Sequence, residues 1–169
     1  MILANSKIPA SSISIDNIKA VIPKFLLLIF LIIWIYGFLS PLLLSGSDPL
    51  LNYSLDRIYS QVCHQESYKC ISIAETEMLV CARCAGIYFG AFIISCLFLF
   101  RKNPEINIKI FLLASIPLLA DVIFTTAELY NYYQPFAFLT GLIFGSIICL
   151  FLLAEIKNLS LNKSINRNE

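Results

Sequence analysis

The sequence predicts an all-α integral membrane protein, a four-helix bundle with an amphipathic helix and a cysteine-rich loop between its first two spans. Two observations predict this class. Hydrophobic residues make up 59% of the 169 positions, charged residues 14%, and the mean hydropathy is +0.81, which is more apolar than in soluble domains. The chain also contains four long apolar runs, at residues 25–44, 86–100, 110–127 and 136–154; the second gives a span of 84–100 if its helix begins at Cys84.

Each run is judged by length, because a helix needs about 20 residues to span a bilayer, within a range of roughly 17–25. The first and fourth runs are long enough. The second qualifies if the helix begins at or before Cys84, and the third if Asp121 is tolerated inside it. A membrane domain at residues 25–154 is therefore expected between a leader (1–24) and a polar tail (155–169), with disorder from about Leu159.

The first run could instead be the apolar core of a cleaved signal peptide, followed by the small residues at 45–47. Such cores are about 7–15 residues long. This run has 20 residues and follows a 24-residue leader. An uncleaved anchor is therefore the prediction, and cleavage is the alternative.

Lysine and arginine predict the orientation in the cell membrane. Nine of the twelve fall in the leader, the loop after the second run and the tail, whereas three fall in the loop after the first run: Arg57, Lys69 and Arg83. The positive-inside rule then places both termini in the cytoplasm and the cysteine-rich loop outside. The formal net charge is only +1, so no nucleic-acid partner is expected; membrane lipids are the expected partners.

An amphipathic helix is expected early in this loop. Asp48-Pro49 is typical of an N-cap followed by proline at the first helical position. Four apolar residues then recur at steps of four, three and four, which places them on one helical face: Leu51, Leu55, Ile58 and Val62. The helix is expected to end at Cys63 and to lie on the membrane surface or against the bundle.

The loop also holds four of the six cysteines and the only histidine. Cys63, Cys70, Cys81 and Cys84 have the spacing C-x6-C-x10-C-x2-C, and His64 follows Cys63. All four cysteines, or His64 with three of them, could bind zinc tetrahedrally. The remaining two, Cys96 and Cys149, lie in apolar runs and are expected to be packing residues.

Two other interpretations of these cysteines remain open. Cys81 and Cys84 could form a redox-active pair with a thiolate favoured by Arg83 and a helix N-terminus, exchange with Cys63 and Cys70, and pass electrons to a quinone. Four-helix quinone-linked disulfide enzymes have a similar architecture, which is an analogy only. Alternatively, the cysteines could form stapling disulfides in a non-enzymatic membrane scaffold.

The third run contains a second candidate group. Asp121, Thr125 and Glu128 are separated by four and three residues and are expected to share a helical face, with Thr140 at a similar depth. A carboxylate inside a span indicates a functional site by default, although Asp121 could merely lock helices together. One hypothesis is a hydrolase or transferase that acts on a lipid-like substrate. In it, a zinc ion keeps an open position for water, Asp121 or Glu128 transfers the proton, and Arg83 binds an anionic head group.

Two pairs of glycines four residues apart, Gly86 with Gly90 and Gly141 with Gly145, predict close packing of the second and fourth spans. We assign no ligand to them.

The motifs CHQ (63–65) and VCARCAGIYFG (80–90), with Pro117, Asp121 and Thr140-Gly141, resemble a prokaryotic multi-pass membrane family, domain of unknown function 2085. The resemblance covers residues 59–145 and implies a small helical membrane bundle without an established activity. In this family the position of Cys70 is commonly serine, and aspartate can replace Cys84. Because aspartate can bind a metal but cannot form a disulfide, the resemblance favours a metal held by Cys63, His64, Cys81 and Cys84, with Cys70 accessory. This chain lacks the family's arginine before Thr140.

Overall fold

The structure is a computed structural model that describes residues 12–43, 49–73, 76–99, 101 and 107–165. Its elements follow in the order α1 (Ser12–Leu43), α2 (Pro49–Tyr59), a 3-10 turn (Ser67–Lys69), β1 (Cys70–Ile73), β2 (Thr76–Cys81), α3 (Ala82–Phe98), α4 (Ile108–Thr126) and α5 (Gln134–Ile165).

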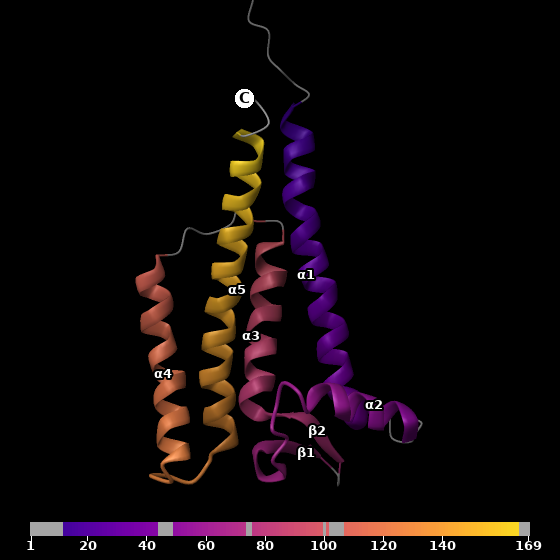
Figure 1. The fold of residues 1–169 in the computed structure, drawn as a ribbon, viewed down its shortest axis with the longest axis vertical. Coiled ribbons are helices and arrows are strands. Elements are labelled where there is room, and N and C mark those ends of the chain that lie inside the picture. The colour runs from indigo at the N-terminus through magenta and orange to yellow at the C-terminus, as the bar shows by residue number, and fades with distance from the viewer. Residues whose placement is uncertain (1–11, 44–48, 74–75, 100, 102–106, 166–169) are drawn as a thin grey trace, which may run out of the picture.

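The four long helices run side by side in the order α4, α5, α3, α1, and α3 packs against α5 and α1 (Figure 1). At one end, α2 lies across the helix axes beside the two strands (Figure 1). We call this the hairpin end. Helix α1 begins and α5 ends at the opposite end, which we call the far end.

Within the described part of the chain, three helical segments are long and apolar enough to cross a membrane: Val21–Leu43, Ile108–Thr126 and Gln134–Ile156. Helix α3 is apolar but has 17 residues, about 25 Å at 1.5 Å per residue. Helix α5 continues to Ile165, so the expected disorder from Leu159 is wrong for this part of the tail. No glycine or proline follows Gly145 before Ile165 to end the helix.

The expected all-α class is incomplete, because the cysteine-rich loop contains an antiparallel hairpin of β1 and β2. Cys70 lies opposite Cys81, and Ile73 lies opposite Thr76. Strand β2 buries Met78 and Val80 and leaves the intervening residues more accessible. This period of two is the strand pattern, and it covers too few residues to stand out beside the long apolar runs.

Helix α2 begins at Pro49 as expected, while Asp48 lies outside the described residues. It ends at Tyr59, four residues before Cys63. The Tyr59 hydroxyl donates a 2.8 Å hydrogen bond to the carbonyl of Trp34 on α1. A Cβ on Gly37 would lie 2.3 Å from that hydroxyl oxygen, so the tyrosine fits because residue 37 has no side chain. The amphipathic helix is thus anchored on α1 by its last residue.

The glycine pairs bring α3 and α5 into backbone contact, which confirms the close packing predicted for them. A Cβ on Gly86 would lie 2.2 Å from the Phe138 carbonyl oxygen, and one on Gly145 would lie 2.0 Å from that of Ile87. Real Cβ atoms do not approach so closely, so the helices can adopt this separation only with glycine at these positions.

Lys24 joins α1 to α3 at the far end. Its buried ammonium group donates hydrogen bonds to the carbonyls of Phe98, at 3.1 Å, and Arg101, at 2.9 Å. The last carbonyls of a helix lack partners within the helix and carry partial negative charge. Lys24 therefore caps the C-terminus of α3. It is also one of the positive charges from which the orientation in the membrane was predicted.

Candidate metal centre

Three sulfur atoms meet at the hairpin end. Cys63 lies in the turn after α2, Cys81 ends β2 and is the N-cap of α3, and Cys84 lies in the first turn of α3. Their Sγ atoms all lie within 4.8 Å of one another. The pair Cys81 and Cys84 can converge because the extended backbone at Cys81 turns directly into a helix, so both sulfurs lie beside one helix start.

Cys63 is held by the turn that follows it. The next residue but one, Gln65, has a φ of 48°, in the left-handed region that non-glycine residues seldom adopt. Its side-chain amide donates a 2.9 Å hydrogen bond to the carbonyl of Leu79 on β2. This bond fastens the CHQ segment to the strand that carries Cys81.

The surroundings of the three sulfurs are apolar. Cys63 is 7% exposed and belongs to a core that includes Phe38 of α1, Tyr59 of α2 and Val80 of β2, with Cys81 and Cys84 packed against it. The site therefore lies where α1, α2, β2 and α3 meet. Polar groups in such a place must be satisfied by partners within the protein.

Hydrogen bonds to Cys63 favour its thiolate. The thiols of Cys81 and Cys84, together with the backbone N–H groups of Cys81 and Gln65, lower the pKa of Cys63 to about 2, although burial opposes this shift. The backbone N–H of Cys81 lies 3.2 Å from the Cys63 sulfur. The pKa of Cys81 is raised, chiefly because its thiol proton is held by Cys63. Two thiols therefore point their hydrogen bonds towards the Cys63 sulfur, and a cation bound by the three sulfurs would replace those protons.

The other two expected ligands are not brought into this group. His64 is exposed and outside the three-sulfur group. Cys70 is 2% exposed on β1, and burial, together with the nearby Cys63 and Cys81, raises its pKa to about 12. None of the six cysteines, all of which the structure describes, forms a disulfide, so the structure does not contain the stapling disulfides considered for a scaffold.

Arg83, between the two cysteines of the CxxC motif, forms an ion pair with Asp121 of α4. Its Nη2 and Nε atoms lie 2.5 Å and 2.9 Å from Asp121 Oδ2. Oδ1 of Asp121 accepts a hydrogen bond from the hydroxyl of Tyr130. The side chain of Asp121 is 1% exposed and that of Arg83 17%. The carboxylate is thus satisfied by its neighbours and joins α4 to α3.

Of the other residues expected near Asp121, Thr125 lies beside it, whereas no hydrogen bond or ion pair described in the structure joins Glu128 or Thr140 to its side chain. Thr125 donates to the Asp121 carbonyl at 2.6 Å, as one helical face requires. Glu128 lies beyond the end of α4 with a φ of 54°, and its exposed carboxylate makes no ion pair within the described part of the chain. Thr140 is buried and donates to the Ala137 carbonyl at 3.1 Å.

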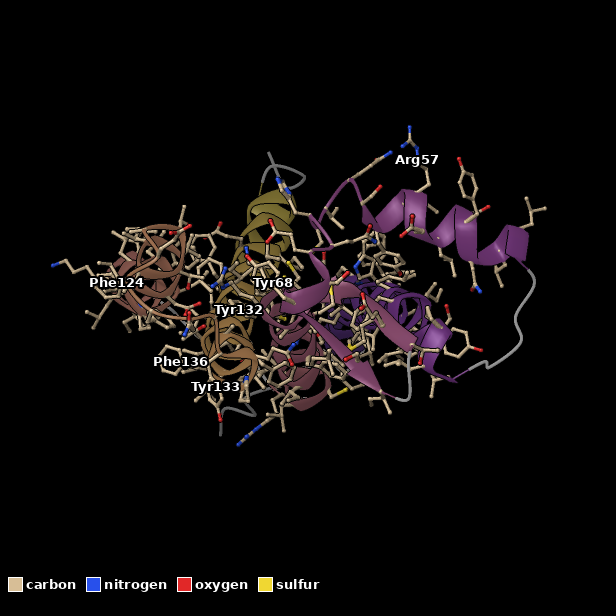
Figure 2. The ribbon with its side chains drawn as sticks, turned by 90° about the horizontal axis from the view of Figure 1, so that it is seen from below. Arg57, Tyr68, Phe124, Tyr132, Tyr133 and Phe136 are labelled. Carbon is tan, nitrogen blue, oxygen red and sulfur yellow. The ribbon has the colours of Figure 1, made fainter. Side chains whose placement is uncertain are left out.

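Two tyrosines of this region were absent from the sequence-based expectations: Tyr130, which bonds Asp121, and Tyr132. The Arg83 guanidinium carbon lies 5.6 Å from the centre of the Tyr132 ring. Figure 2 shows Tyr132 beside Tyr68 at the hairpin end, and their rings meet edge to face with centroids 6.2 Å apart. The ion pair between Arg83 and Asp121 was not predicted either. Its signal in the sequence was that each is an isolated charge in apolar surroundings, where a buried charge needs a partner of opposite sign.

The comparisons with known proteins agree with the apolar helices in indicating a membrane protein. An uncharacterized protein of Methanocaldococcus jannaschii is 29% identical to this chain over 137 residues, which cover 75% of this chain and 87% of that protein. No solved structure matches the chain. The family model described as predicted membrane protein, domain of unknown function 2085, matches residues 63–151, which begin at Cys63 and include the CxxC motif and Asp121. The chain belongs to this family.

Proposed function

We propose that this membrane protein binds a metal ion through the thiolates of Cys63, Cys81 and Cys84. The observation that carries the proposal is the convergence of three sulfurs within 4.8 Å. Zinc–sulfur bonds of about 2.3 Å place the sulfurs of a tetrahedral site about 3.8 Å apart. The 4.8 Å limit on the distances between the three sulfurs admits this spacing, and zinc, expected from the sequence, binds such ligands.

We propose that four helices, α3 included, cross the membrane. Lys24 of α1 binds the carbonyls of Phe98, the last residue of α3, and of Arg101 beyond it. Phe38 of α1 contacts Tyr88 near the start of α3, with ring centroids 6.0 Å apart. Helix α3 thus runs along α1 within the span Val21–Leu43. The positive-inside rule then assigns the far end to the cytoplasm and the three sulfurs to the extracytoplasmic side.

The geometry supports metal binding more directly than it supports hydrolysis or group transfer on a lipid-like substrate. Catalysis would need an open metal position and a free base. The Asp121 carboxylate already accepts hydrogen bonds from Arg83 and Tyr130, so it is not a free base. Arg83 is held by the same ion pair and is not free to bind a head group. Glu128 is exposed outside this group. The catalytic proposal for these three residues therefore depends on their rearrangement around a substrate.

Metal analysis of the full chain in detergent, with free-thiol titration of the same sample, tests the function. We expect about one metal ion per chain and its loss in Cys81→Ser, because each thiolate is a ligand. The matched control is Cys96→Ser, which removes an exposed thiol of α3 outside the group and should leave the metal content unchanged. Metal-free protein that stays metal-free after incubation with zinc under reducing conditions would contradict the proposal.

Thiol–disulfide exchange is the second candidate, because the Cys63 thiolate lies within 4.8 Å of two thiols. A low-pKa thiolate beside a second thiol is the arrangement of redox-active cysteines. Paired, reducible thiols without metal in the same titration would favour this candidate, and a quinone would then be the electron acceptor to test.

A further inference from the structure

We infer that the three-sulfur centre binds copper(I) in preference to zinc. The inference rests on the metal-binding function proposed above and names the ion that the site selects. It follows from three properties of the centre: the kind of donor atoms, their number and their surroundings.

The donors are all sulfur. Thiolates are soft ligands that bind both copper(I) and zinc, but a zinc site completes its set of four with imidazole, carboxylate, water or a fourth thiolate. The only imidazole, on His64, is exposed and outside the group. The buried carboxylate, on Asp121, has its oxygens bonded to Arg83 and Tyr130. Among the described residues, neither nitrogen nor carboxylate oxygen joins the three sulfurs.

The number of donors suits a lower coordination than zinc adopts. Structural zinc sites are almost always four-coordinate, and catalytic ones add water as the fourth ligand. Copper(I) is stable with two or three thiolates in a linear or trigonal arrangement. Three bonds of about 2.3 Å in a plane place the sulfurs about 4.0 Å apart, which also lies within the 4.8 Å limit of the group.

The surroundings disfavour water as a fourth ligand. Phe38 and Val80 are fully buried in the core that includes Cys63, and Cys63 itself is 7% exposed. Cys81 and Cys84 are partly exposed, so this shielding is strongest on the Cys63 side, where apolar surroundings tend to exclude water. The same shielding protects copper(I), which disproportionates readily in water. The ion enters as copper(I), each thiol that becomes a ligand releases its proton to solvent, and no electron is transferred.

The test is an anaerobic competition on the full chain in detergent. Copper(I) is buffered with bathocuproine disulfonate, zinc is added in about 100-fold excess, and the bound metals are measured after desalting. We expect about one copper(I) per chain and little zinc, with X-ray absorption showing sulfur as the only ligand type. Cys63→Ser should weaken copper(I) binding by more than about 100-fold.

Two matched variants serve as controls. His64→Ala removes the neighbouring imidazole and Cys96→Ser a thiol outside the group, and both should retain copper(I) with unchanged affinity. Zinc retained against copper(I), nitrogen in the absorption spectrum, or loss of copper(I) in His64→Ala would overturn the preference for copper(I) while leaving metal binding intact. Failure to bind either ion would overturn both proposals.

Discussion

Arg83 and Asp121 form an ion pair between α3 and α4, with Nη2 2.5 Å from Oδ2. Helix α4 packs against α5 at the edge of the row (Figure 1), and Asp121 and Leu118 are its two buried residues. The pair therefore joins α4 to α3 in addition to the packing of α4 against α5. Because Arg83 lies between Cys81 and Cys84, it also connects this helix to the cysteine motif.

Asp121→Asn should loosen α4 and lower the stability of the protein. The amide keeps hydrogen-bonding ability but leaves the Arg83 cation, 17% exposed, without its counter-charge, at a cost on the order of 2–3 kcal/mol. We expect the thermal unfolding midpoint in detergent to fall by roughly 5–10 °C. Glu128→Gln is the control, because that exposed carboxylate makes no ion pair in the described part of the chain. Equal midpoints for the two variants would contradict this role.

Gly145→Ala should force α3 and α5 apart. The added methyl group would lie 2.0 Å from the Ile87 carbonyl oxygen, and neither backbone can move aside without separating the helices. Overpacking costs about 1–3 kcal/mol, measured as a lower midpoint of thermal unfolding. Ile143→Ala on the same helix changes a side chain that is 40% exposed and should have little effect. A Gly145→Ala midpoint at or above that of the unmodified chain would show that the contact does not set the helix spacing.

Lys24→Met should fray the C-terminal turn of α3. The substitution preserves the apolar stem but removes two hydrogen bonds from a charged donor, each contributing about 1.5–3 kcal/mol. Hydrogen exchange of the amides in the last turn of α3 should accelerate, while the first turn stays protected. Lys109→Met, at an exposed position, is the control. Unchanged exchange in Lys24→Met would show that solvent or lipid caps this helix equally well.

In reduced, metal-free protein, Cys63 and Cys70 should differ in how fast they are alkylated and in how that rate depends on pH. The pKa of Cys63 is lowered to about 2, so it is a thiolate throughout pH 6–9 and its reaction with iodoacetamide should not vary with pH. The pKa of Cys70 is raised to about 12, so it remains a thiol and should react little. Peptide mass spectrometry measures both. In denaturant, both should react faster as pH rises towards about 8.5. A rate at Cys63 in the native protein that rises with pH would contradict the lowered pKa.

Sequence patterns predicted those features that depend on nearby residues. Helix α2 begins at Pro49, and α3 begins at Ala82, two residues before the expected Cys84. The spacing of Gly86 and Gly90, and of Gly141 and Gly145, predicted the close contact of α3 and α5. The hairpin was missed because β1 has four residues and β2 six, too few for alternation to be distinguished from an apolar loop.

The sequence by itself determined that the chain is helical and apolar enough for a membrane, and that thiols gather at the start of α3. It named five candidate ligands, and the family resemblance favoured His64 over Cys70 as the partner of the other three. Packing of α1, α2 and the hairpin brings Cys63 to Cys81 and Cys84 and leaves His64 exposed. It also pairs Arg83 with Asp121 and Lys24 with the end of α3. These relationships join residues 18 to 74 positions apart, and only the arrangement of the packed elements determines which of them meet.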